Sequence, residues 1–185
     1  MEKQKESRRV LMTKRLLKES LLDMLKDKNI SDVNITELCK RADVNRSTFY
    51  SYYDTVNDIL NEIGEDLIAQ LPTMKAENQF FQIEESVITE FTQFMHYIRI
   101  HAEEFEILLR PDNKYFREKL METIMHHFKK NLPENDTNSF HLLGYIFSIN
   151  GAIALFIEWI KSGFKISDKD FAIFVLKMCF RVNDF

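Results

Sequence analysis

Apolar residues recur at every third or fourth position along most of the chain, which is the spacing of one face of an α-helix. In residues 13–26, TKRLLKESLLDMLK, leucine and methionine side chains form one stripe and charged side chains occupy the opposite side. No segment alternates apolar and polar residues as a half-buried strand does. The pattern therefore predicts an all-α protein of about nine helices. Five of them are expected in the C-terminal part, at residues 83–100, 102–110, 113–132, 137–162 and 168–182.

Polar residues suited to helix capping mark the starts of two short helices that follow the first one. Asn34 has a glutamate, Glu37, three positions later, and this spacing predicts a capping box. Asn45 is a candidate N-cap for the next helix. Between the two short helices, Asp43 stands where a turn is needed, and aspartate tolerates the left-handed conformation better than most residues.

A helix, a short helix, a turn of about four residues and another short helix together make a helix-turn-helix motif. Residues 1–60 are therefore predicted to form a three-helix, helix-turn-helix domain. Thr55, with Asp58 three positions later, marks the start of a fourth helix that ends near residue 72. Residues 61–185 are predicted to form a helical bundle that continues from the first domain.

The segment NRSTFYSYYDTV, residues 45–56, has the residues of two different faces. Phe49 and Tyr53 are four positions apart and are expected to pack inward, with Leu21, Leu38 and Val44. The opposite face offers an arginine suited to guanine or phosphate, short hydroxyl groups that approach base edges, and tyrosine hydroxyls suited to phosphate oxygens. The segment is therefore predicted to pack on one side and to read DNA with the other, through Arg46, Ser47, Thr48, Tyr50, Ser51 and Tyr52.

Charge is distributed unevenly and supports a polyanion partner at the N-terminal end. Residues 1–60 carry 12 Lys/Arg and 10 Asp/Glu, a balance of +2, whereas residues 61–185 carry 13 and 19, a balance of −6. A basic start on an acidic body is consistent with a polyanion partner at the N-terminal end, although a basic leading arm is often only a solvated tail. The composition, 45% hydrophobic with 16 Phe, favours a packed core over disorder.

The sequence offers no catalytic or cofactor-binding motif. It has no Gly-rich phosphate loop, no Ser or Cys nucleophile motif and no Glu-x-x-His pair of the kind that builds di-metal sites. Cys39 and Cys179 fit no metal-binding or redox spacing and are predicted to be free thiols in a reducing cytoplasm. We therefore expect a protein that is not an enzyme and binds no cofactor and no metal.

Residues 137–157 carry no formal charge, which raises the question of a membrane helix. A spanning helix needs about 20 apolar residues. This run is interrupted by Ser148, Asn150 and Gly151 and soon meets Glu158. It is therefore predicted to be a core or interface helix, and no contact with a membrane is expected.

Residues 34–60, NITELCKRADVNRSTFYSYYDTVNDIL, resemble the DNA-binding signature of the TetR family of transcriptional regulators, and the resemblance extends over residues 13–60. It implies that residues 34–41 form the helix that crosses the DNA backbone and that residues 45–52 form the recognition helix. It also implies that Thr36 contacts a phosphate or a base. The implied groove contacts are Arg46, Ser47, Thr48 and Ser51, and the implied backbone or base contacts are Tyr50 and Tyr52.

Two positions depart from the family pattern. Asp43 stands where the family usually has glycine, which is a mild change. Val56 stands where the family usually has a lysine that meets a phosphate near the start of the fourth helix. The resemblance therefore implies that this chain lacks one phosphate contact, or that Arg46 and the basic N-terminus compensate for it.

The C-terminal part resembles a subgroup of the family that includes coactivator-like members related to regulators of dihydroxyacetone metabolism. The resemblance lies in residues 97–120, YIRIHAEEFEILLRPDNKYFREKL, and residues 151–171, GAIALFIEWIKSGFKISDKDF. In the family the last two long helices usually build a four-helix dimer interface, which implies a homodimer. The residues expected at that interface are Tyr145, Ser148, Gly151, Ala152, Leu155, Trp159, Phe171 and Phe174.

Two functions remain open for the helical body. The family default is a repressor that leaves its operator when a small apolar ligand in the body moves the fourth helix and changes the distance between the two recognition helices. The alternative is a transcriptional coactivator or protein-interaction module, whose acidic body binds a partner protein. A ligand pocket between the middle helices, for which ordinary core packing is the alternative, would be lined by Phe91, Phe94, Met95, Phe105, Leu108 and Phe116.

Overall fold

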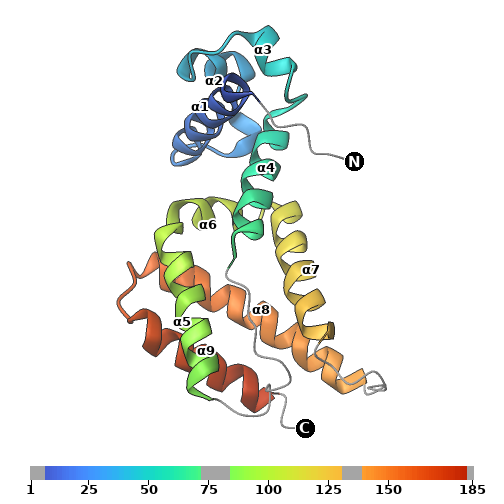
Figure 1. Cartoon of the computed structure of the whole chain (residues 1–185), viewed down its shortest axis with the longest axis vertical. Coiled ribbons are helices and arrows are strands. Elements are labelled where there is room, and N and C mark those ends of the chain that lie inside the picture. Colours follow the sequence, from blue (N-terminus) through green and yellow to red (C-terminus); the bar gives the residue numbers. More distant parts are fainter. Residues whose placement is uncertain (1–6, 72–83, 131–138, 183–185) are drawn as a thin grey trace. The chain divides into compact units, whose positions relative to one another are not determined.

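The computed structural model describes residues 7–71, 84–130 and 139–182, and the regular elements within these ranges are all helices (Figure 1). The predicted all-α class is therefore confirmed. None of the helices in these ranges is long and apolar enough to span a membrane. The elements are α1 (Arg8–Leu25), the 3-10 helix η1 (Ile30–Asp32), α2 (Ile35–Arg41), α3 (Arg46–Tyr50), α4 (Val56–Ala69), α5 (Glu85–Ile100), α6 (Ala102–Leu108), α7 (Lys114–Lys130), α8 (Ser139–Lys161) and α9 (Asp168–Val182).

The first helix starts earlier than the apolar stripe indicates. Ser7 caps α1 by accepting a hydrogen bond from the backbone N–H of Val10, with 3.4 Å between Oγ and N. The first turns of α1 are not part of the core, since Leu11 and Met12 are exposed. The buried apolar stripe begins at Leu17, about two and a half turns after the helix start at Arg8.

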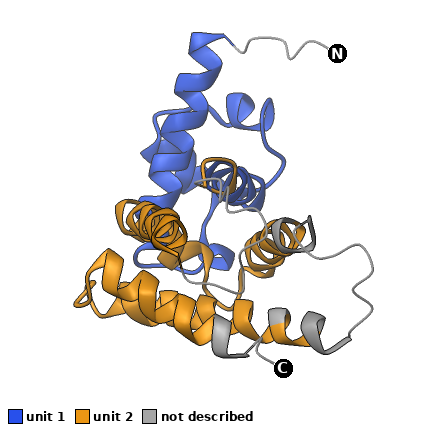
Figure 2. Cartoon of the chain, turned by 60° about the horizontal axis from the view of Figure 1, so that its bottom comes forward, with its two compact units in different colours: residues 1–67 blue, residues 68–185 orange. Residues whose placement is uncertain are grey.

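The chain divides into two compact units, unit 1 (residues 1–67) and unit 2 (residues 68–185), shown in different colours in Figure 2. The division falls inside α4, seven residues beyond the expected boundary at residue 60. Along α4, Ile59, Ile63 and Leu67 are buried at helical spacing, so the compact part of unit 1 continues almost to the end of that helix.

The core of unit 1 consists of large apolar side chains from all four of its α-helices. Phe49 of α3 is fully buried, and its ring lies 6.0 Å from the ring of Tyr53 between their centroids. Burying a side chain of this size contributes about 1.5–3 kcal/mol. Both residues point inward as predicted, whereas Val44 is half-buried. The other fully buried members include Leu17, Leu21, Leu38 and Ile59.

In unit 2, α9 packs against both α5 and α8, and aromatic rings fill the space between them. Phe156 of α8 lies edge-to-face with Phe94 of α5 at 5.9 Å and with Phe171 of α9 at 6.1 Å. Trp159 of α8 stacks on Phe171 with 4.3 Å between ring centroids and 12° between planes. These rings join the three helices into one apolar core.

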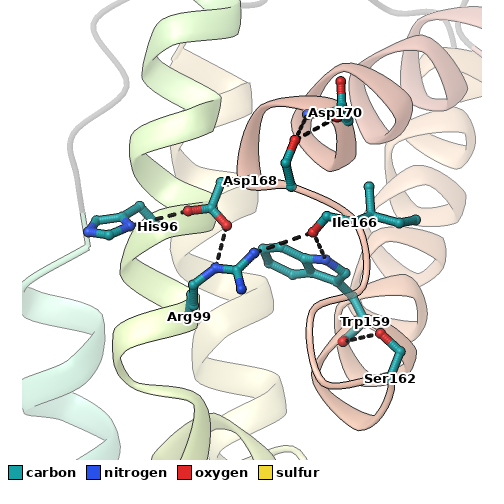
Figure 3. Close-up of polar contacts among 8 residues, drawn as sticks. His96, Arg99, Trp159, Ser162, Ile166, Asp168 and Asp170 are labelled. Carbon is teal, nitrogen blue, oxygen red and sulfur yellow. Dashed lines mark hydrogen bonds and ion pairs between the residues drawn. The ribbon is translucent and has the colours of Figure 1, made fainter.

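The turn between α8 and α9 is held by Arg99 of α5 (Figure 3). Arg99 Nε donates to Asp168 Oδ1 at 2.5 Å, and its Nη2 donates to the carbonyl oxygen of Ile166 at 3.3 Å. The guanidinium carbon lies 4.4 Å from the ring centroid of Phe164 and 5.1 Å from that of Trp159. Trp159 Nε1 donates to the same Ile166 carbonyl at 3.0 Å. One arginine therefore combines an ion pair, a backbone bond and two cation–π contacts.

Candidate nucleic-acid interface

The turn between α2 and α3 is built on a left-handed residue at the end of α2. Asp43 has φ of +53°, and its N–H donates to the carbonyl oxygen of Lys40 at 3.4 Å. The N–H of Val44 donates to the carbonyl oxygen of Cys39 at 2.9 Å. These two bonds form a Schellman motif, in which glycine is the usual left-handed residue. Asp43 therefore takes the turn conformation predicted for it.

The capping box predicted for α2 is half present. Asn34 Oδ1 accepts the backbone N–H of Thr36 at 2.7 Å, so asparagine caps the helix as expected. The carboxylate of Glu37 instead binds Lys28 Nζ, at 2.7 and 2.8 Å. The capping-box pattern predicts that Glu37 accepts a backbone N–H, but Glu37 pairs with Lys28, which precedes η1. A charged ammonium is a stronger hydrogen-bond donor to a carboxylate than a neutral N–H is.

At the start of α4 the box is complete in both directions. Thr55 Oγ1 accepts the N–H of Asp58 at 3.3 Å, and Asp58 Oδ2 accepts the N–H of Thr55 at 2.7 Å. The same carboxylate oxygen accepts the N–H of Asp54 at 3.0 Å. Val56, the first helical residue, brings no charge to this end of α4. The family pattern described above has a lysine at this helix start. In this chain the charged side chains there are the carboxylates of Asp54 and Asp58.

Helix α3 presents polar side chains outward from a buried anchor. Phe49 is fully buried, while Arg46 and Tyr50 are exposed. Arg46 Nη2 donates to Tyr50 Oη at 3.1 Å, and its guanidinium carbon lies 5.7 Å from the Tyr50 ring centroid. The Tyr50 ring meets the Phe49 ring edge-on at 5.3 Å. The predicted DNA contacts on the same short segment are Ser47 and Ser51, which are exposed, and Thr48 and Tyr52, which are half-buried.

Two further predicted contacts are constrained by local hydrogen bonds. Ser51 Oγ donates to the carbonyl oxygen of Ser47 at 3.0 Å, so the Ser51 hydroxyl keeps only its acceptor sites for another partner. Thr36 is exposed in the first turn of α2, and its backbone N–H donates to Asn34 Oδ1. Because the hydroxyl hydrogen of Ser51 is already donated to Ser47, Ser51 is suited to accept a hydrogen bond from a base amino group.

A half-buried ion-pair network joins α1 to α4. Lys18 Nζ lies 2.8 Å from Glu62 and 2.6 Å from Asp66, and Lys14 Nζ lies 3.5 Å from Glu62. Burial acts to lower the pKa of Lys18, but hydrogen bonds to Asp66 and Glu62 outweigh it and leave that pKa raised. Burial acts to raise the pKa of Glu62, but Lys18, Lys14 and Tyr53 leave it lowered. Both charges are therefore retained at neutral pH.

The residues predicted for a ligand pocket lie in the interior of unit 2, apart from half-buried Phe91. Phe105 of α6 and Phe116 of α7 meet edge-on at 6.2 Å, and Phe91 meets Phe94 of α5 at 6.5 Å. Phe94 belongs to the ring cluster of α5, α8 and α9. The four phenylalanines therefore form two ring pairs, and the other two residues, Met95 and Leu108, are fully buried.

The residues predicted for a dimer interface separate into two kinds. Trp159 and Phe171 are buried against each other, and Ser148 is buried as well, so these three pack within the protomer. Gly151 and Phe174 are exposed. Ala152 and Leu155 are half-buried, and the side chain of Tyr145 lies outside the described part. Three further apolar residues of α8 are exposed and had no role assigned from the sequence, and these are Leu143, Ile146 and Phe147.

Comparison with known proteins finds a family model and a related sequence. A TetR-type family model, described as the transcriptional regulator C-terminal region, matches residues 85–180, which is 96 of 185 residues. An uncharacterised HTH-type transcriptional regulator of Bacillus subtilis (strain 168), YxbF, is 35% identical over 51 residues. That match spans 28% of this chain and 13% of the relative.

Solved structures share the fold at low identity. A TetR transcriptional regulator from Streptococcus agalactiae 2603V superposes with a TM-score of 0.71 at 20% identity, over 93% of this chain and 96% of that one. The dihydroxyacetone kinase operon activator DhaS superposes with a TM-score of 0.57 at 14% identity, over 92% and 96%. At these identities the likeness shows a shared helical fold.

Proposed function

The chain belongs to the TetR family of transcriptional regulators, and we propose that it is a homodimeric repressor whose operator binding is released by a small apolar ligand. Regulators of this family bind operator DNA and usually act as dimers. The observation that carries the proposal is α3, which buries Phe49 and directs Arg46 and Tyr50 outward. Arginine binds the two acceptors of guanine in the major groove, and tyrosine hydroxyls suit phosphate oxygens.

The last two helices support the dimer. Leu143 and Phe147 of α8 are 59% and 66% exposed, and Phe174 and Met178 of α9 are both 45% exposed. Both pairs are four residues apart and so share a helix face. An added Cβ at Gly151 would meet nothing within 4 Å, although glycine inside a helix costs about 1 kcal/mol. Packing within the protomer therefore does not require a glycine at this position. A glycine there would allow a helix of a second copy to approach closely.

The proposed ligand would bind in unit 2, where buried rings of α5, α6 and α7 provide an apolar environment. Such a ligand controls DNA binding only if it favours one protein conformation over another. Shifting a two-state equilibrium from mostly bound to mostly released needs a difference of a few kcal/mol between the two affinities, about 5.5 kcal/mol for a complete switch.

The test is binding of the purified full chain to fragments of its own upstream DNA across a range of salt. We expect saturable binding to one fragment, with affinity falling steeply as salt rises, because phosphate contacts release counterions. Replacing Arg46 with alanine should weaken that binding by about 1–3 kcal/mol and leave helicity and dimerisation unchanged, since its side chain is exposed. Binding to no preferred fragment at low salt would contradict the proposal and favour a coactivator.

Val56→Lys is expected to strengthen DNA binding. The substitution places an ammonium at the start of α4, where Asp54 and Asp58 now make the surroundings acidic. One added phosphate contact should steepen the slope of log affinity against log salt by about 0.9. Filter binding at several salt concentrations measures both quantities, with Val56→Met as the uncharged control. An unchanged slope would show that this helix start lies away from the DNA backbone.

A further inference from the structure

We propose that Asn45 reads an adenine in the operator, beside the base contacted by Arg46. This inference rests on the proposed operator binding and adds a base-reading residue to it. Asn45 directly precedes α3 and its side chain is exposed. The N-terminal residues of a recognition helix are the ones that meet base edges in the major groove.

The starting observation is that two asparagines occupy the same structural position and use their side chains differently. Asn34 before α2 and Asn45 before α3 both have extended backbone conformations, with φ, ψ of −94°, 131° and −66°, 143°. The Asn34 carboxamide caps its helix through the N–H of Thr36 at 2.7 Å. The Asn45 carboxamide makes no cap hydrogen bond to the start of α3.

The backbone of Asn45 still performs the structural task of an N-cap residue. Its carbonyl oxygen accepts the N–H of Phe49 at 3.0 Å, which is the first hydrogen bond of α3. Asparagine, aspartate, serine and threonine are favoured at this position because their side chains also bond to the helix start. Because the Asn45 side chain makes no cap hydrogen bond to α3, it is available to bind another partner.

The chemistry of the carboxamide selects that partner. It has one acceptor oxygen and an NH2 group with two donors, which together match the N6 amino group and N7 of adenine. A phosphate has only acceptor oxygens, so it would bind the NH2 group of the carboxamide and leave the carboxamide oxygen without a partner. The neighbouring Arg46 has donors alone, which match the two acceptors of guanine. The sequence Asn45–Arg46 therefore favours a half-site in which an adenine lies close to a guanine.

The experiment is selection of binding sites from random DNA duplexes by the full-length protein and by its Asn45→Ala variant. The wild-type protein should enrich a site with a fixed adenine, and the variant should accept any base there. Replacing that adenine by 7-deazaadenine removes N7 and should weaken wild-type binding by about tenfold while leaving the variant unaffected. Thermal unfolding provides the matched control, because Asn34→Ala loses a cap bond and should lower the midpoint more than Asn45→Ala.

Several results would overturn the inference. If both proteins enrich the same site with the same adenine, Asn45 does not read it. If Asn45→Ala weakens binding to all duplexes equally, the side chain contacts phosphate. If Asn45→Ala lowers the unfolding midpoint as much as Asn34→Ala, the side chain caps α3 in solution. Failure of the wild-type protein to enrich any site would remove the proposed operator binding and this inference together.

Discussion

Replacing Phe147 with glutamate is expected to yield a folded monomer that has lost most of its affinity for the operator. Phe147 is 66% exposed in the protomer, so a charge there costs the isolated chain little. At an interface between two copies, the same charge is buried without a partner, which costs several kcal/mol. Two linked DNA-binding units bind more tightly than one by about 10²- to 10⁴-fold, and a monomer gives up that gain.

Analytical ultracentrifugation measures the oligomeric state, and binding to the operator fragment measures the affinity. Gln93→Glu is a matched control, because Gln93 is an exposed neutral residue of α5 and the substitution adds the same charge. Circular dichroism should show the same helix content in the wild-type protein, Phe147→Glu and Gln93→Glu. A Phe147→Glu protein that stays dimeric would place the interface away from this face of α8.

Trp159→Ala is expected to destabilise unit 2 more than any exposed substitution. Trp159 stacks on Phe171, meets Phe164 edge-on at 4.8 Å and donates a hydrogen bond to Ile166. Truncating a buried tryptophan to alanine costs about 3–5 kcal/mol through lost contacts and the cavity that remains. A loss of that size should lower the unfolding midpoint by about 10 °C or more.

Trp159→Phe is the control for this result, because it keeps a ring against Phe171 and removes only the hydrogen bond. It should lose about 1 kcal/mol from the missing bond, with a further cost for the smaller ring. Both variants should be compared at one protein concentration, since the proposed dimerisation would raise the apparent stability. Equal midpoints for Trp159→Ala and the wild-type protein would show that the α8–α9 turn contributes little to folding.

The sequence was sufficient to predict the helical class, the core face of α3 and the left-handed turn at Asp43. These features follow from short-range rules: apolar periodicity, side-chain volume and local turn chemistry. The role of Glu37 was not predictable in this way, because its partner Lys28 comes from outside the capping motif. Asn45 likewise fits the pattern of a cap, and only the structure shows that its side chain is not used as one.

Helix α8 shows the limit of pattern reading in the C-terminal part. Apolar residues occur on every side of it, so periodicity does not distinguish the face packed in the protomer from an exposed one. The structure makes that distinction, burying Trp159 and exposing Phe147. The sequence likewise cannot separate predicted ligand-pocket residues from ordinary core residues, because the walls of a cavity and a packed core have the same composition.

The position of Trp159 also gives the protein an intrinsic optical probe. It is the single tryptophan of the chain, and its indole contacts both the guanidinium of Arg99 and the ring of Phe171. Its fluorescence depends on how α5, α8 and α9 are packed, because each helix contributes one of these groups. Tryptophan emission can therefore test the proposed ligand binding without a label and without knowledge of the operator.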